Sequence, residues 1–115
     1  MAFDHRAHLC TAFAEIQARG LQGATESVMD RFRAFANEAN MPEKFNVTLT
    51  VFWMRLIYSA IERNPQASSA EVLFEKEPWL LDKDVPYKFY SNELLNSDHA
   101  RHRFVEPDKQ TFPGS

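Results

Sequence analysis

The sequence predicts an all-α fold, a compact single-domain bundle of five or six helices around one central buried helix at about residues 46–63. Residues 45–63 have the densest apolar content of the chain and are flanked by proline-containing breaks. A nineteen-residue stretch far exceeds the usual strand of about five or six residues. Its apolar side chains recur at spacings of three and four, the period of a helix with one buried face. These side chains are Leu49, Phe52, Trp53, Leu56, Ile57, Ala60 and Ile61.

The length of the chain predicts one domain. The sequence has 115 residues and 44% hydrophobic content, and single domains most often contain about 100 to 150 residues. We expect one helical domain over residues 1–107. We expect residues 108–115 to form a frayed C-terminal tail, because they are mostly small or polar and include proline and glycine.

Charge and cysteine content limit the environment and the partners. The chain has 13 basic and 16 acidic residues, a net charge of −3, whereas a nucleic-acid-binding protein normally has a basic face. Cys10 is the single cysteine, which is typical of a reducing compartment. No apolar run reaches the length of a membrane span, and the start of the chain lacks the features of a signal peptide. We therefore expect a cytoplasmic protein with no nucleic-acid or membrane partner.

Capping and breaking residues define the first three helices. Asp4 is a candidate N-cap for a first helix that ends at Gly20. A second helix is predicted to start at residues 23–25 and to end at Asn40. Asn46 is the natural N-cap of the central helix.

Shorter helices are predicted after the central one. Ser68 and Glu71 have the spacing of a capping box for a fourth helix. A fifth helical segment is predicted to begin at residues 84–86. Ser97 or Asp98 then caps a last helix, which Pro107 ends. The mostly acidic region at residues 71–84, which includes much of the fourth helix, is typical of a solvated face.

The four histidines occur in two similar short motifs, D-H-R-A-H at 4–8 and D-H-A-R-H at 98–102. Imidazoles three residues apart on a helix can share a metal ion, and an acidic neighbour can orient a ring. His5 and His8 are therefore candidate metal or ligand contacts. A structural role is the alternative for both, because His5 lies over the apolar stripe of its helix. For the second motif, a position on the surface is favoured.

Arg55 and Asn46 are candidate ligand contacts at the central helix. A guanidinium group in an apolar helix can bind a carboxylate or phosphate, but Arg55 also fits a solvent-facing or ion-paired role. Asn46 can bond a ligand or cap the helix, and capping is favoured. The sequence identifies no catalytic residue, so enzymatic activity stays open.

Several short sequence motifs together resemble those of a family of short bacterial helical proteins. The resemblance implies no activity. Relatives often have a histidine where this chain has Asn46, which argues against a three-histidine metal site. The matching motifs are F-D-H-R-A-H-L at 3–9, P-E-K-F at 42–45, L-T-V-F-W at 49–53, L-L-D-K at 80–83, Y-S-N-E-L-L-N-S-D-H-A-R at 90–101 and E-P-D at 106–108.

Two hypotheses for function follow. The first is a polar pocket at one end of the bundle that binds a small anionic ligand or a transition metal, with catalysis open. The metal version uses His5 and His8. The competing hypothesis is a protein-interaction module or homo-oligomer subunit whose polar motifs are structural. The candidate pocket residues are His5, His8, Asn46, Arg55, Tyr90 and Arg101.

Overall fold

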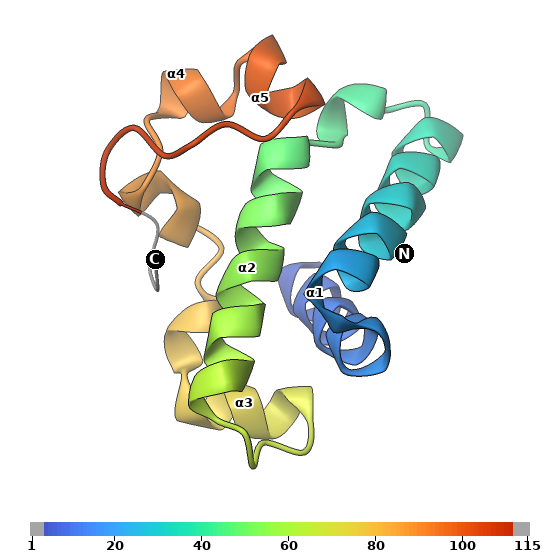
Figure 1. Cartoon of the computed structure of the whole chain (residues 1–115). Coiled ribbons are helices and arrows are strands. Elements are labelled where there is room, and N and C mark those ends of the chain that lie inside the picture. Colours follow the sequence, from blue (N-terminus) through green and yellow to red (C-terminus); the bar gives the residue numbers. More distant parts are fainter. Residues whose placement is uncertain (1–3, 112–115) are drawn as a thin grey trace.

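A computed structural model describes residues 4–111, which form helices and turns with no strand (Figure 1). The predicted all-α bundle around a central helix is confirmed. The α-helices are α1 (His5–Glu38), α2 (Val47–Arg63), α3 (Ala70–Lys76), α4 (Asn92–Leu95) and α5 (Asp98–His102). The 3-10 helices are η1 (Pro42–Lys44), η2 (Pro78–Leu81) and η3 (Val85–Lys88).

Helix α1 is bent into two arms at Gly20. The first arm covers residues 5–19 and the second arm covers residues 21–38. Gly20 has φ 78° and ψ 173°, a backbone conformation that residues with a side chain rarely adopt. The predicted break is confirmed, but the second arm begins directly after Gly20 and not at residues 23–25.

The carboxylate of Glu15 connects the two arms. It accepts hydrogen bonds from Arg19 at 2.7 Å and from Arg31 of the second arm at 3.0 Å. Hydrogen bonds from Ser27 and Arg19 lower the pKa of the Glu15 carboxyl group. A charged Glu15 therefore ties the two arms together across the kink.

Polar side chains cap the helices where the sequence predicts a start, with one correction. Asp4 accepts a hydrogen bond from the backbone N–H of Ala7, and Asn46 accepts one from that of Leu49.

The start of helix α3 differs from the prediction. Helix α3 is capped by Ser69 and not by Ser68, and its first-turn Glu71 forms an ion pair with Arg6 instead of completing a capping box. Asn40 has φ 59° just after α1, as its predicted C-terminal position requires. Ser97 caps α5.

The core lies around α2. Its buried face contacts both arms of α1, while α3 lies near its C-terminal end and α4 and α5 lie near its start (Figure 1). The predicted stripe is mostly buried, although Leu49, Trp53 and Ile61 are only partly so. The fully buried members are Phe52, Leu56, Ile57 and Ala60.

The chain after α5 is extended and crosses the start of α2 as a C-terminal strap (residues 103–110). The sequence predicts helix up to Pro107, but α5 ends at His102, and Arg103 is extended with φ −151°. The hydroxyl of Thr48 donates to Arg103 O at 2.8 Å and accepts from Val105 N at 3.1 Å. These bonds satisfy backbone groups that a further helical turn would otherwise have used.

The strap continues into the region that the sequence assigns to a frayed tail. Asp108 accepts from the backbone N–H and the hydroxyl of Ser91, both at 2.7 Å. The backbone N–H of Lys109 donates to Phe89 O at 2.8 Å, and the side chain of Gln110 donates to Lys88 O. Residues 108–110 are therefore held in place, and residues 112–115 lie outside the described residues.

Within residues 4–111, no helix combines the length and apolar character needed to cross a bilayer.

Candidate functional site

A cavity of about 870 Å³ lies between the two arms of α1 and the first half of α2, with η1 and η3 at its edges. Small-molecule sites typically measure about 300 to 1,000 Å³. Most of the lining is apolar or aromatic. Leu9, Ala12, Val28 and Met54 are among its buried members. The kink at Gly20 matters here, because it places both arms of α1 against the same cavity.

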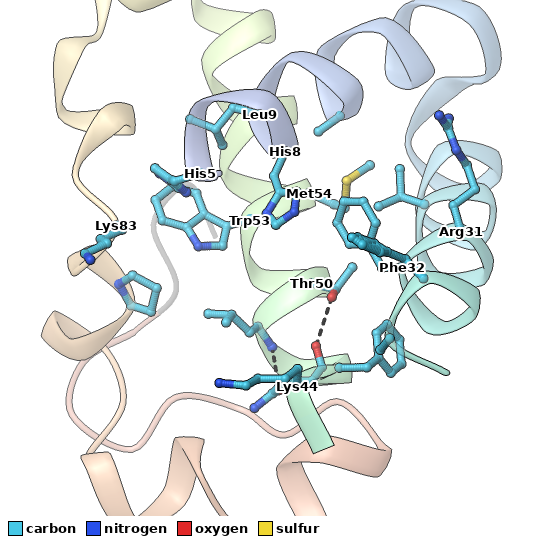
Figure 2. Close-up of a pocket in the computed structure, with 18 of the residues that line it drawn as sticks. His5, His8, Leu9, Arg31, Phe32, Lys44, Thr50, Trp53, Met54 and Lys83 are labelled. Atoms are coloured by element: carbon cyan, nitrogen blue, oxygen red, sulfur yellow. Dashed lines mark hydrogen bonds between the residues drawn. The ribbon is translucent and has the colours of Figure 1, made fainter. Parts of the chain in front are cut away.

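His5 forms part of the cavity wall, and its ring is fixed by two contacts. Its Nε2 lies 2.8 Å from the backbone oxygen of Leu80. Because a carbonyl oxygen only accepts, Nε2 must carry the proton. The ring also packs against Trp53, with centroids 4.6 Å apart and an angle of 58° between the planes (Figure 2).

His8 lies one turn further along the first arm and faces the second arm. Its ring packs on Phe32 with centroids 4.6 Å apart and an angle of 42°. Burial, followed by the nearby His5, lowers the pKa of His8, and Asp4 opposes this only in part. His8 is therefore an uncharged imidazole at neutral pH.

The metal version of the pocket hypothesis finds no complete ligand set in the described part of the chain. No group of three or more His, Cys, Asp or Glu side chains within residues 4–111 is arranged to hold a metal ion. Nε2 of His5 is also committed to Leu80 O. His5 and His8 alone are too few ligands for a typical protein metal site.

Asn46 also lines the cavity, but its amide group is used in the fold. Its oxygen caps α2, and its Nδ2 donates to Leu95 O at 2.9 Å. Its backbone oxygen accepts from the hydroxyl of Thr50 at 2.9 Å, one of the bonds drawn in Figure 2. The capping interpretation is therefore confirmed, and the amide joins the start of α2 to the end of α4.

The structure places the other three candidates away from the cavity lining. Arg55 is exposed, with its guanidinium 4.5 Å from the ring centroid of Phe104. Tyr90 is fully buried and donates to Val105 O at 2.6 Å. Burial and the nearby Glu106 raise the pKa of Tyr90 to about 12. The cavity thus brings together His5, His8 and Asn46 only, the last of which is used as a cap.

Arg101 belongs to α5 and forms an ion pair with Asp98. Its Nε is buried without a hydrogen-bond partner among residues 4–111. His99 and His102 are exposed on the same helix, as predicted, and Nδ1 of His102 bonds to Asp98 O at 2.8 Å.

Sequence reasoning missed the cationic side chains of the cavity. Arg31, Lys44 and Lys83 line it, together with the single carboxylate of Asp84. Figure 2 shows the three cations on different sides of the rings of His8 and Trp53. Arg31 is paired with Glu15, whereas Lys44 and Lys83 form no ion pair with the carboxylates of residues 4–111. The signal was present as a lysine in each of two short motifs, P-E-K-F and L-L-D-K.

The cavity's outer edge contains exposed apolar side chains. Phe35 is 44% exposed, Met41 48% and Tyr87 40%, and all three belong to the lining. Large apolar side chains gathered at one opening mark a surface that can receive another molecule.

None of the protein-family models matches the chain, and no curated protein or solved structure matches it. The resemblance to short bacterial helical proteins therefore stays a prediction, and function has to be inferred from the cavity itself.

Proposed function

We propose that the protein binds a small organic anion, with the apolar body of the ligand inside the cavity and its charged group near Lys44 and Lys83. The observation that carries this proposal is the combination of a large apolar interior with two cations that have no ion-pair partner in the described chain. Burial of an apolar body supplies most of the affinity, and the lysines select the charge of the ligand.

The donor groups favour an anion over a metal ion. Lysine ammonium groups bind carboxylate, sulfonate or phosphate and repel cations. An uncharged His8 adds a polar contact inside an otherwise apolar interior without the cost of burying a charge. Asp84 is the only acidic side chain among the described lining residues, which include Arg31, Lys44 and Lys83, so basic side chains outnumber acidic ones in the lining.

The test compares a carboxylate with a neutral ligand of similar shape. Isothermal titration calorimetry should show that 2-naphthoate binds more tightly than 2-naphthylmethanol. Each exposed ion pair is worth about 0.2–1 kcal/mol. Lys44→Gln with Lys83→Gln should therefore weaken 2-naphthoate binding by about tenfold and leave the alcohol nearly unaffected.

Two matched controls make this test specific. Lys76→Gln with Lys88→Gln removes the same charge from two exposed lysines outside the cavity lining and should leave binding unchanged. Ala36→Trp fills the cavity from the second arm and should abolish binding. Ala34→Trp places the same ring on an exposed position of that arm and should not. Equal effects of the two lysine pairs, or of the two tryptophans, would rule out this cavity as the site.

A second candidate function is a docking surface for another copy of this chain. The observation in its favour is the exposed edge formed by Phe35, Met41 and Tyr87. Sedimentation equilibrium distinguishes the two candidates. A dimer that dissociates when Phe35→Ser and Tyr87→Ser are combined supports the second, and a monomer at all concentrations supports the first.

A further inference from the structure

We infer that the bound anion is aromatic, a flat aryl carboxylate or a ligand of equivalent charge and shape, whose ring lies among the ring side chains of the cavity. This inference rests on the proposed function, since it names the chemical class of the anion. Its failure would leave the binding of anions in general intact.

The first observation is the number and origin of the rings. The aromatic lining residues come from five separate segments that meet only in the folded chain: both arms of α1, the segment after η1, α2 and η3. Besides the two histidines, they are Phe32, Phe35, Phe45, Trp53 and Tyr87.

The second observation is how these rings are arranged. His5 and Trp53 form one pair and His8 and Phe32 form another, each with centroids 4.6 Å apart and with the planes tilted. Both pairs face the same interior (Figure 2). Tilted pairs present edges as well as faces, and an added aromatic ring is stabilised by offset stacking on faces and by edge contacts. A saturated ring gains only from buried area at the same positions.

The third observation is the chemistry between the rings. Met54 is buried at the cavity wall and Met41 lies at its edge. Thioether sulfur is polarizable and makes favourable contacts with aromatic rings. A rigid ring system also loses little conformational freedom on binding, whereas a flexible alkyl chain loses much more.

The charge of the ligand follows from the surroundings of the rings. Lys44 and Lys83 stand at the edge of the space that the rings enclose (Figure 2). A ring placed among Trp53, His8 and Phe32 can therefore extend a single acidic group outward to a lysine. Ammonium groups also attract the faces of aromatic rings, so the same lysines can lie against the aromatic ring of the ligand without loss of affinity.

The decisive experiment compares ligands that differ only in aromaticity. The two ligands are 2-naphthoate and trans-decahydronaphthalene-2-carboxylate, which share skeleton and charge. Their affinities for the full chain are to be measured by calorimetry at neutral pH. One or two favourable ring contacts predict that the naphthoate binds about tenfold more tightly. Equal or tighter binding of the saturated acid would overturn the aromatic class while leaving the proposed binding of anions in place. Absence of binding by both acids would overturn both proposals.

Ring variants locate the effect in the cavity. Trp53→Leu and Phe32→Leu should each remove most of the aromatic preference and leave affinity for the saturated acid nearly constant. Phe104→Leu removes a ring that lies under Arg55, outside the lining, and should change neither affinity. Because Trp53 and Phe32 also pack on the core, Phe35→Leu at the exposed edge serves as a variant that keeps the fold. Unchanged preference in all three cavity variants would contradict the inference.

A competing occupant gives a different result. If the rings receive a second copy of the chain instead of a small aromatic acid, the chain should form a dimer that saturating 2-naphthoate does not dissociate. Sedimentation velocity with and without the acid measures this. A dimer that persists at saturating 2-naphthoate would assign the surface to self-association and overturn the inference, whereas loss of a dimer on addition of the acid would support it.

Discussion

The polar groups on the two sides of the start of α2 differ in whether they have partners within the described chain. On the strap side, Thr48 is 0% exposed and its hydroxyl both donates and accepts, while the hydroxyl of Tyr90 is bonded to Val105 O. On the cavity side, Lys44 and Lys83 have no carboxylate partner in the described chain, and aromatic rings stay exposed. The hydrogen-bonded polar groups hold the fold, whereas the two exposed lysines have no carboxylate partner in the described chain, and the proposed function assigns them to a ligand.

The largest expected effect comes from breaking the strap side. Thr48→Val keeps the shape of the side chain but leaves Arg103 O and Val105 N without their partner. Each buried group left unpaired costs about 1–3 kcal/mol, so we expect a loss of about 3 kcal/mol in the free energy of unfolding. At this size that lowers Tm by about 10 °C in a thermal melt followed by circular dichroism.

Thr50→Val is the matched control, because Thr50 faces the cavity two residues further on. Its hydroxyl bonds to Asn46 O, which also accepts from the backbone N–H of Thr50. The carbonyl therefore keeps a donor, and Tm should change by less than about 2 °C. Similar losses in the two valine variants would contradict the contrast between the sides.

A smaller effect is expected at the kink that forms the cavity wall. Gly20→Ala adds a side chain where φ is 78°, although no atom lies within 4 Å of the added Cβ. The cost is therefore one of backbone conformation alone, about 1–3 kcal/mol. Urea denaturation measures it. Gly23→Ala, on the same helix without a positive φ, meets only Arg19 Cβ, at 3.2 Å, and should stay within about 1 kcal/mol of the wild type. A Gly20→Ala variant as stable as the wild type would exclude a required kink.

The smallest effect is the pH dependence that His8 contributes. Its pKa is lowered in the folded protein by burial and by His5. In the unfolded chain His8 binds a proton near the ordinary histidine pKa of about 6.5, and in the folded chain it binds the proton only at a lower pH. Stability is therefore complete above that pH and falls as the pH drops through 6.5 toward the lowered pKa of folded His8.

His8→Gln removes this titration and should flatten the fall in Tm between pH 7.5 and 5.5. His99→Gln, on the exposed face of α5, should leave the fall unchanged. If His8→Gln retained the full pH dependence, His8 would have to be solvated and not part of the cavity wall.

The helices were predictable because their signals are local. A glycine at the kink, an asparagine after α1 and a side-chain cap before α2 each act on their own few residues. The periodic apolar stripe of α2 likewise reports its buried face directly. These features need no knowledge of distant parts of the chain.

The strap was not predictable because its bonds join distant residues. Thr48 is separated from Arg103 by 55 positions and from Val105 by 57. A threonine at the start of an apolar helix looks like a weak helix former and gives no sign of two long-range bonds. For the same reason, Tyr90 was interpreted as a pocket residue, whereas its hydroxyl secures the strap.

The candidate site was only partly predictable. His5 and His8 stood out because histidine is rare and its spacing is helical, and both line the cavity. Lys44 and Lys83 did not stand out, because a lone lysine in a short polar turn is ordinary. Their place in the proposed site follows from the fold, which brings η1 and the segment between η2 and η3 to the same cavity, and not from either short motif.

The strap also has a consequence for synthesis. A chain is made at about 5–20 residues per second, so several seconds pass between the appearance of Thr48 and that of Val105. During this interval the hydroxyl of Thr48 lacks both of its native partners, and the core lacks the side chains of Phe104 and Val105 that pack against it. The bundle therefore reaches its final form late, after the residues of the strap have been added.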